Sequence, residues 1–381
     1  MRMQLVAKHP LVTVDVSAVP ANMTGVGRYA VGVLSEIGAP ATEAGIEIAA
    51  VTKLGDGDRF RRYAPGITMV ETVPTSRLRR VIYEQRRMGD VMDRMGALVH
   101  HGIHYTLPGH MRAKKVVTIH DATLIEHPEW HERAKVTFFS RMIARSAREA
   151  DALVFPSASA LEGFARHFDT RAHTVVIPHG VNDARFEPPE GVGDDEQIDA
   201  LGVTRPYLLF CGTLEPRKNL ERLLDAHMSA WAGGPGLVVA GLAGWKDSRL
   251  RPKLDALVGS RAGKVLGFVS DAQLGALYRN ALATLYPSLE EGFGLPGLEA
   301  MSQGSLLITS EGSAMQEYAA GVALFVDPLD VSSLAAAIER VIVGGAELEA
   351  MAAAGRERAR GMTWAASAQS HLALYRSILG L

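Results

Sequence analysis

Short runs of β-branched and aromatic residues alternate with segments of helical length along most of the chain. The runs that we assign to strands include LVTVDV, IEIAAVT, KVVTIHD, DALVFP, HTVVIP, YLLFCG, GLVVAG, ATLYPS and SLLITS. Helical patterns fit between most of them, for example over residues 133–149, 219–231 and 271–280. Strands that alternate with helices build parallel sheets that helices cover on both faces. The pattern therefore predicts an α/β fold with doubly wound parallel sheets.

The length of the chain divides this pattern into two domains, because 381 residues exceed the size at which a single core keeps growing. The alternation stops over residues 183–206, where prolines, glycines and acidic residues carry no apolar period. We expect a linker there. We predict two Rossmann-like domains, 1–182 and 207–362, that face each other across a cleft, with helix 363–381 packing back on the first. In such sheets ligands bind outside the carboxyl ends of the strands.

The composition excludes several classes of function. Apolar residues make up 47% of the chain and the formal charge is −2, which offers no overall attraction for nucleic acid. The one cysteine, Cys211, lies in the apolar run YLLFCG, where we expect a buried strand thiol rather than a nucleophile. No stretch has the length and apolarity of a membrane span, and the N-terminus lacks the pattern of a secretion signal. We therefore expect a cytoplasmic protein.

One short stretch, YPSLEEGFGLPGLEAM over residues 286–301, concentrates glycines between two carboxylates, Glu291 and Glu299. It reads as the end of a strand, a loop and the start of a helix. Glycines before a helix let backbone N–H groups approach an anionic ligand such as a phosphate. Carboxylates beside a phosphate repel it unless they accept hydrogen bonds from hydroxyl groups, so we expect both to bind sugar or ribose hydroxyls. The alternative is that Glu299 complements the helix dipole and that Glu291 is solvated.

Charged and titratable residues also follow two other predicted strands. Arg217 and Lys218 come after the first strand of the second domain, where two cations suit a diphosphate leaving group. The alternative is a solvated basic pair. His120 and Asp121 close the strand KVVTIHD, where a histidine can bind a sugar hydroxyl or transfer a proton. A structural histidine is the alternative there.

The stretch EGFGLPGLEAM, with seven residues between its glutamates, resembles the signature of the family 4 glycosyltransferases, which have the GT-B fold. Other parts of the sequence resemble this family in the same order along the chain, namely TGVGRY, TIHD, VIPHGVN, GTLEPRKN and GFVSDAQLGALYRNA. The resemblance implies transfer of a sugar from a nucleotide donor with retention of anomeric configuration. It implies that the donor binds the second domain, that the acceptor binds the first, and that the protein needs no metal or other cofactor.

The resemblance also implies roles for individual residues. In the second domain it assigns the diphosphate to Arg217 and Lys218, the ribose to Glu299, and the donor sugar to Glu291 with the amides of Gly292, Phe293 and Gly294. In the first domain it implies that Gly25 and Gly27 face the phosphate, and that His120 lies beside the reacting sugar. We take His120, Asp121 and Glu291 as the catalytic candidates. Thr213 stands where many relatives carry another arginine, so the charge on the diphosphate rests on the later pair.

Taken together, GVGRY, TIHD and GTLEPRKN resemble mannosyltransferases that use GDP-mannose, including those that build phosphatidylinositol mannosides. The expected acceptor is a glycan or glycolipid of this kind. Two alternatives remain open. One is a transferase that uses UDP-glucose or UDP-N-acetylglucosamine. The other is a catalytically silent protein that binds sugar nucleotides.

Three other signals have better explanations than the functions they suggest. GVGRYA matches a dinucleotide-binding fingerprint, but it begins ten residues beyond Asp15 instead of directly after the strand. DGD at 56–58 imitates a metal motif, yet a polar loop explains it. The histidines with metal-like spacing lack the cysteines or carboxylates that complete a zinc site; they are His100, His101, His104, His127 and His131.

Residues 76–95 carry a pattern that bears on the acceptor. As one continuous helix, the segment puts one apolar face opposite a basic face. The apolar face consists of Leu78, Val81, Ile82, Met88, Met92 and Met95, and the basic face of Arg79, Arg80, Arg86, Arg87 and Arg94. Either the helix packs on the core with a solvated basic face, or it meets anionic lipid. The second alternative predicts a peripheral protein at the inner face of the plasma membrane.

Overall fold

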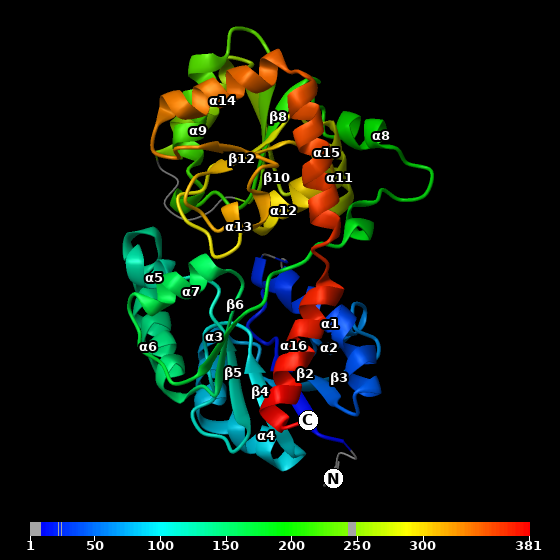
Figure 1. The fold of residues 1–381 in the computed structure, drawn as a ribbon, viewed down its shortest axis with the longest axis vertical. Helices are drawn as coiled ribbons and strands as arrows, with labels where there is room; N and C mark the ends of the chain where they lie inside the picture. The colour runs from blue at the N-terminus through cyan, green and yellow to red at the C-terminus, as the bar shows by residue number, and fades with distance from the viewer. Residues whose placement is uncertain (1–8, 22, 24, 243–248) are drawn as a thin grey trace. The chain divides into compact units, whose positions relative to one another are not determined.

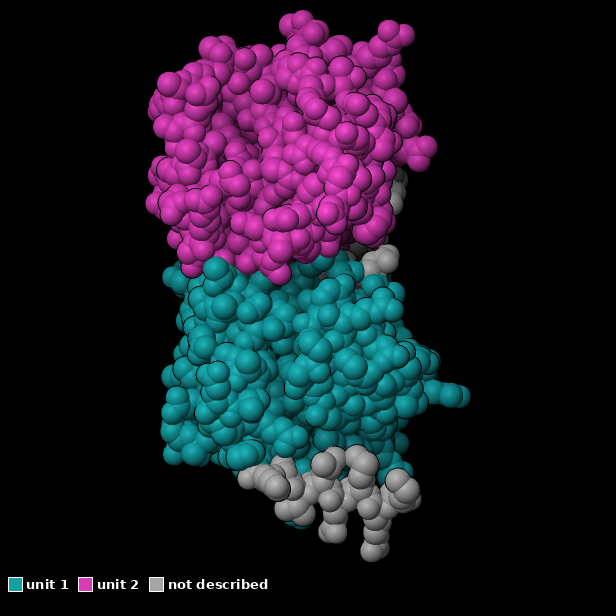
Figure 2. All heavy atoms as spheres, turned by 90° about the vertical axis from the view of Figure 1, so that its right-hand side faces the viewer, with its two compact units in different colours: residues 1–180, 363–381 teal, residues 181–362 magenta. Residues whose placement is uncertain are grey.

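The computed structural model describes residues 9–21, 23, 25–242 and 249–381. Most of the N-terminal segment on which the prediction about a secretion signal depends lies outside the described residues, and so does Thr24 of the TGVGRY stretch. The chain forms two compact units, coloured separately in Figure 2. Unit 1 comprises residues 1–180 and 363–381, and unit 2 comprises residues 181–362.

Unit 1 is built on a seven-stranded parallel sheet with the order β3-β2-β1-β4-β5-β6-β7 (Figure 1). Its strands are β1 (Leu11–Asp15), β2 (Glu47–Lys53), β3 (Thr68–Val73), β4 (Ala97–Gly102), β5 (Lys114–Thr118), β6 (Ala152–Phe155) and β7 (His173–Val176). Its helices are α1 (Gly25–Glu43), α2 (Gly57–Arg61), α3 (Arg77–Tyr83), the π-helical turn η1 (Glu84–Met88), α4 (Gly89–Met95), α5 (Thr123–Glu126), η2 (Pro128–Trp130), α6 (Arg133–Glu149), α7 (Ala158–Ala165) and α16 (Trp364–Leu379). The order of the strands changes direction between β1 and β4, and ligands bind at such a switch point in open α/β sheets.

Unit 2 repeats this design with a six-stranded parallel sheet of order β10-β9-β8-β11-β12-β13. Its strands are β8 (Tyr207–Cys211), β9 (Gly236–Ala240), β10 (Gly263–Gly267), β11 (Thr284–Tyr286), β12 (Leu307–Ser310) and β13 (Leu324–Val326). Its helices are η3 (Asp183–Phe186), α8 (Asp194–Ala200), η4 (Pro216–Lys218), α9 (Leu220–Ala230), α10 (Leu250–Gly259), α11 (Asp271–Asn280), α12 (Leu295–Ser302), α13 (Gln316–Ala319), α14 (Val331–Val343) and α15 (Ala346–Arg360). The switch point of this sheet lies between β8 and β11.

The α/β prediction is confirmed, and so are the two doubly wound parallel sheets. Inner strands such as β6 and β8 are buried along their whole length, which explains why their sequences are apolar without alternation. Cys211 is the last residue of β8. Burial raises the pKa of its thiol to about 12, so it is the buried strand thiol that the sequence predicts.

The segment 183–206 differs from the linker that its composition predicts. It contains η3 and the seven-residue helix α8, and it belongs to unit 2. Three acidic residues in the first turn of α8 interact favourably with the helix dipole. Ile198 of this helix is fully buried in the core of unit 2. An amphipathic helix of two turns is too short to show a period in the sequence.

Helix α16 packs against α1 within unit 1, and Figure 1 shows the two side by side. Two glycines permit this approach. A Cβ atom on Gly32 of α1 would lie 2.2 Å from the Trp364 ring, and a Cβ atom on Gly180 would lie 2.2 Å from the backbone of Thr363. Larger residues at either position would push α16 away from the sheet.

Residues 77–95 are helical, but the expectation of one apolar face along this segment is wrong. The π-helical turn η1 interrupts it, and each residue added to a turn rotates the following helix by about 100°. Leu78 and Ile82 of α3 are therefore 73% and 48% exposed, whereas Met88 and Met92 are fully buried in the core. The methionines do not form the lipid-facing surface that the sequence left open as an alternative.

Candidate active site

Arg217 and Lys218 follow β8 in the short helix η4, as residues at the carboxyl end of a central strand. Asn219 ends this turn in the left-handed conformation, with a φ of 59°. Its side-chain amide donates to the carbonyl oxygens of Pro287, at 3.1 Å, and Pro328, at 2.6 Å. The backbone carbonyl of Arg217 accepts a 2.7 Å hydrogen bond from the N–H of Leu289. The bonds to Pro287 and Leu289 join the turn after β8 to the loop after β11 across the switch point of the sheet, and the bond to Pro328 joins it to the segment after β13.

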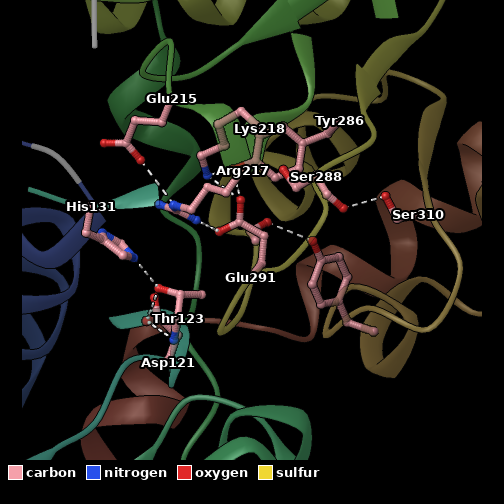
Figure 3. A network of polar contacts seen from close by, with 12 residues as sticks. Asp121, Thr123, His131, Glu215, Arg217, Lys218, Tyr286, Ser288, Glu291 and Ser310 are labelled. Carbon is pink, nitrogen blue, oxygen red and sulfur yellow. Dashed lines mark hydrogen bonds and ion pairs between the residues drawn. The ribbon is translucent and has the colours of Figure 1, made fainter. Parts of the chain in front are cut away.

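The side chains of these two cations converge on one carboxylate, that of Glu291 (Figure 3). Arg217 donates from NH1 to Oε2 at 2.6 Å, and the Lys218 ammonium pairs with Oε1. The hydroxyl of Tyr286 also donates to Oε1, at 2.9 Å. Glu215 pairs with Nε of Arg217 at 3.1 Å. Two cations and two carboxylates therefore balance each other in charge.

Burial by itself would raise the pKa of Glu291, but Arg217 and Lys218 outweigh it and lower this pKa to about 2. Glu291 is therefore ionised at every physiological pH and cannot serve as a general acid. Burial and the charge of Arg217 lower the pKa of Lys218, while Glu291 opposes them. The Glu291 carboxylate is thus the anion that lies between the buried ammonium of Lys218 and the half-buried guanidinium of Arg217.

The glycine-rich loop follows Glu291 and leads into α12. Gly294 has a φ of 81° and precedes the first residue of the helix. A Cβ atom there would lie 2.3 Å from Sδ of Met315, so a side chain is excluded by both conformation and space. The carbonyl of Gly294 accepts a 2.8 Å hydrogen bond from the Tyr318 hydroxyl, and the Phe293 ring packs 5.3 Å from the Tyr318 ring. The loop is held rigidly with its backbone close to its neighbours.

Glu299 lies on the buried side of α12 and pairs with an arginine from the start of unit 2. NH1 of Arg185 lies 2.8 Å from Oε1 of Glu299, and Nε lies 3.3 Å from Asp271 at the start of α11. The guanidinium stacks 4.1 Å above the Phe186 ring. Because Arg185 fixes one carboxylate oxygen of Glu299, the orientation of the other oxygen is fixed as well.

In unit 1, His120 lies two residues after the end of β5. Its Nε2–H donates to the carbonyl of Ile103 at 2.8 Å, so in the neutral ring Nδ1 is the basic nitrogen. Burial lowers the pKa of His120, against the effect of the bond to Ile103. The rings of Tyr29 and Tyr105 meet the imidazole edge-on, with centroid distances of 5.3 and 5.7 Å. The imidazole is thus neutral and held from three directions.

The Asp121 carboxylate accepts hydrogen bonds within the loop after β5. Its Oδ1 accepts hydrogen bonds from the backbone N–H of Thr123, at 3.1 Å, and from the Thr123 hydroxyl, at 2.7 Å. The Thr123 oxygen lies 3.0 Å from Nε2 of His131, which donates to it because the hydroxyl proton already points to Asp121. These bonds hold the start of α5 and account for an aspartate at this position without a role in chemistry.

The two glycines of the GVGRY stretch lie in the first turn of α1 and differ in their surroundings. A Cβ atom on Gly27 would meet Met23 and Val19 at 3.0 and 3.1 Å. A Cβ atom on the exposed Gly25 would meet nothing within 4 Å. Packing therefore explains a glycine at position 27 and leaves the one at position 25 unexplained.

Comparison with known proteins extends these observations to the whole chain. Residues 23–185 match the model of Glycosyltransferase Family 4, and residues 194–358 match that of Glycosyl transferases group 1. The O-antigen chain mannosyltransferase B of Escherichia coli is 30% identical over 273 residues, which is 70% of this chain and 71% of that protein. The chain belongs to the family 4 glycosyltransferases.

Two further relatives of this glycosyltransferase match smaller shares of their own lengths. The GDP-mannose-dependent alpha-(1-6)-phosphatidylinositol dimannoside mannosyltransferase of Mycobacterium tuberculosis is 30% identical over 63% of this chain and 61% of that protein. The O-antigen chain mannosyltransferase RfbU of Salmonella typhimurium is 25% identical over 62% of this chain and 63% of that protein. Membership of the family implies a nucleotide-sugar donor and an acceptor.

Solved structures agree on the GT-B fold of this glycosyltransferase. Sucrose-phosphate synthase from Thermosynechococcus elongatus superimposes with a TM-score of 0.77 at 20% identity, over 98% of this chain and 100% of that one. HepE from Anabaena, solved with UDP and glucose, superimposes with a TM-score of 0.75 at 14% identity, over 97% of this chain and 100% of that one. At these identities the likeness shows the fold alone.

The described part of this glycosyltransferase offers neither a cluster of metal ligands nor a membrane-spanning helix. Within residues 9–21, 23, 25–242 and 249–381, no three histidine, cysteine or acidic side chains are arranged to hold a metal ion. In the same part of the chain, no helix has the length and apolarity needed to cross a membrane. DGD at 56–58 lies around the start of α2, where Asp56 and Asp58 pair with Arg59 and Arg61.

Sequence reasoning missed Arg185, Tyr286 and Glu215 in this glycosyltransferase. Tyr286 is the last residue of β11 and five positions before Glu291, so its place at a strand end was a usable signal. Arg185 lies in the segment interpreted as a linker, 114 positions before Glu299. No local pattern connects residues at that separation.

Proposed function

We propose that this family 4 glycosyltransferase moves a hexose, with retention of configuration, from a nucleoside diphosphate to a glycan or glycolipid. The donor that we propose is GDP-mannose. The observation that carries the proposal is the convergence of Arg217, Lys218 and Tyr286 on the Glu291 carboxylate after two neighbouring strands of unit 2. The choice of mannose rests on relatives whose names state that they are mannosyltransferases.

In this proposal the Glu291 carboxylate occupies, before the donor binds, the position that the diphosphate later shares. The diphosphate carries more negative charge than one carboxylate, so it competes for Arg217 and Lys218 when it enters. Glu291 then turns its freed oxygen to a hydroxyl of the donor sugar. When the sugar leaves, the diphosphate gains negative charge and the two cations stabilise it.

Two further groups of unit 2 complete the proposed donor site. The amides of Gly292, Phe293 and Gly294 bind the donor sugar, and the rigid turn at Gly294 fixes their direction. Glu299, held by Arg185, accepts hydrogen bonds from the ribose hydroxyls. Both roles are supported by the fixed geometry around these residues.

Unit 1 contributes the acceptor side and His120. Nδ1 of the neutral imidazole accepts a hydrogen bond from a hydroxyl of the reacting sugar, which orients the sugar. We assign Asp121 to support of the loop after β5, because Thr123 engages its carboxylate. In this proposal the backbone N–H groups of Gly25 and Gly27, in the first turn of α1, bind the donor phosphate.

No resident metal enters this proposal, because Arg217 and Lys218 supply the positive charge that the diphosphate requires. We further propose that α3 and the following turn η1 contact an anionic membrane surface that carries the acceptor. The exposed Leu78 and Ile82 supply apolar contacts, and the exposed Arg79, Arg86 and Arg87 attract anionic lipid. This surface replaces the methionine face that the sequence suggested, and it supports a peripheral location at the inner face of the plasma membrane.

The donor and the reaction are tested by turnover. Purified protein is incubated with GDP-mannose, UDP-glucose or UDP-N-acetylglucosamine and with saccharide and glycolipid acceptors. The release of nucleoside diphosphate is followed, and NMR gives the configuration of the new glycosidic bond. We expect GDP-mannose to be consumed and the α configuration to be kept. Consumption of a UDP-sugar instead would replace the donor, and binding without turnover of any donor would favour a silent sugar-nucleotide-binding protein.

The membrane surface is tested by co-sedimentation with vesicles. We expect binding to anionic vesicles that weakens as salt rises, and no binding to neutral vesicles. A variant with Arg79, Arg86 and Arg87 changed to Ser is expected to lose binding. Arg80 is left in place because it lies 4.0 Å from the buried Glu84. Equal binding by this variant would contradict the proposal, and the exposed Arg141, Arg148 and Arg171 changed to Ser provide a control with the same net charge.

A further inference from the structure

A chain of five buried hydrogen bonds runs through unit 1 and joins α16 to α1, β5 and β4. Nδ1 of His371 bonds to the carbonyl of Ser367 at 2.8 Å, and Nε2 lies 2.7 Å from the Tyr29 hydroxyl. Tyr29 in turn lies 2.8 Å from the hydroxyl of Thr118. Thr118 lies 2.8 Å from Nε2 of His101, whose Nδ1 lies 2.6 Å from the Tyr375 hydroxyl.

The chemistry of the end groups fixes the direction of every bond. A carbonyl oxygen accepts only, so Nδ1 of His371 carries the proton and Nε2 of the neutral ring accepts from Tyr29. The Tyr29 oxygen is then left to accept from Thr118, and Thr118 to accept from Nε2–H of His101. Nδ1 of His101 therefore accepts from Tyr375. Every donor in this series has one acceptor. All five hydrogen bonds are donated in the same direction, from Tyr375 towards the carbonyl of Ser367.

Burial keeps all of these groups in the neutral state that this scheme requires. Each of the five side chains is at most 1% exposed; they are Tyr29, His101, Thr118, His371 and Tyr375. Burial lowers the pKa of His371 to about 4 and lowers the pKa of His101 well below its ordinary value. Burial also raises the pKa of both tyrosines. Removal of the hydroxyl of Tyr29 or of Thr118 would leave one donor and one acceptor buried without partners.

The middle of this series of hydrogen bonds lies next to His120, the candidate catalytic histidine. Thr118 is the last residue of β5, two positions before His120. The Tyr29 ring packs edge-on against the His120 imidazole, at 5.3 Å between centroids. The Tyr29 hydroxyl is the atom that makes two of the five hydrogen bonds. Its ring therefore cannot rotate away from His120 without breaking both.

We propose that Tyr29 and His371 are positioning residues for His120, so that the C-terminal helix α16 sets the orientation of a catalytic group that follows β5. The inference rests on the proposed function, in which His120 binds the reacting sugar. Tyr29 and His371 are 342 positions apart in the sequence and are joined by one hydrogen bond. The C-terminal helix, to which the sequence assigns no chemistry, thus contributes to the site.

The test compares variants that break the Tyr29–His371 bond from either side. Tyr29→Phe keeps the ring beside His120 and removes the hydroxyl, while His371→Leu removes the acceptor. We expect each to lower kcat about five- to tenfold with little change in KM for the donor. The double variant should lose about as much as the stronger single one, since both break the same bond. His371→Gln, whose carbonyl oxygen reaches the place of Nε2, should keep most of kcat.

Two controls separate positioning from loss of stability. Tyr207→Phe removes a buried hydroxyl in unit 2, which donates to Leu277 at 2.9 Å, and should lower stability without the effect on kcat. All kcat values are measured well below the melting temperature of each variant. Unchanged kcat in folded Tyr29→Phe, or single effects that multiply in the double variant, would overturn the inference. If His371→Leu does not fold, Tyr29→Phe and His371→Gln decide.

A spectroscopic measurement does not depend on activity. The imidazole NMR signals of His120 are recorded for the wild type and for Tyr29→Phe. We expect a change in their position and in the pKa that they report, and unchanged signals would overturn the inference. Absence of turnover in the wild type would refute the proposed function and leave this measurement to decide the role of Tyr29.

Discussion

Replacement of Lys218 by methionine tests the pair of cations after β8. Lys218→Met keeps the unbranched stem of the side chain, one atom shorter, and removes the ammonium that pairs with Glu291 and with the Tyr286 hydroxyl. A charge-assisted hydrogen bond to a phosphate is worth about 1.5 to 3 kcal/mol, which corresponds to roughly a ten- to hundredfold loss in kcat/KM. Calorimetry with the nucleoside diphosphate and steady-state kinetics measure this loss. Unchanged binding and kinetics would refute the assignment.

Lys218→Met is also expected to destabilise the protein. A second substitution separates this loss of stability from the loss of binding. Without Lys218, the buried Glu291 keeps Arg217, at 2.6 Å, and loses its other cation. Breaking a buried ion pair from one side costs about 3 to 5 kcal/mol. The double variant Lys218→Met/Glu291→Gln removes the uncompensated charge. We expect it to recover most of the thermal stability and none of the activity, and Lys264→Met, at an exposed lysine of β10, to behave like the wild type.

Three further predictions concern other parts of the chain. Chelation with EDTA should leave most of the transferase activity intact, and a complete loss that metal restores would contradict the proposed donor site. Burial and the nearby Asp15 raise the pKa of Glu84 to about 7, so the folded state resists its ionisation and loses stability as pH rises from about 4.5 to 7. Glu84→Gln should therefore stabilise the protein more at pH 8 than at pH 5, by up to about 3 kcal/mol in denaturant unfolding, and an equal effect at both would argue against the shift. Gly294→Ala should lower the melting temperature by several degrees, at a cost of about 1 to 2 kcal/mol or more, whereas Gly25→Ala, with open space for its Cβ, should melt like the wild type.

The fold was predictable because its signals are local. The helices expected at 133–149, 219–231 and 271–280 correspond to α6, α9 and α11, since each has an apolar period. The segment 76–95 shows where this reasoning fails. A single π-helical turn changes the phase of the helix, and nothing in the spacing of its apolar residues reveals the turn.

The site was predictable only to the extent that its residues belong to short motifs. Arg217, Lys218 and Glu291 each lie just after a strand, and their convergence follows from the parallel sheet. The bonds of Arg185 to Glu299 and of His371 to Tyr29 connect residues 114 and 342 positions apart. Such contacts depend on how helices pack, which the spacing of residues in one sequence does not contain.

Calorimetric titration with GDP, UDP and ADP tests the central claim most directly, because it asks whether unit 2 holds a nucleoside diphosphate through Arg217 and Lys218. We predict that the wild type binds GDP at one site, more tightly than UDP or ADP, and that Lys218→Met weakens this binding by about tenfold or more. Tighter binding of UDP would change the donor and keep the site. Failure of the wild type to bind any of the three, or equal binding by Lys218→Met, would contradict the account.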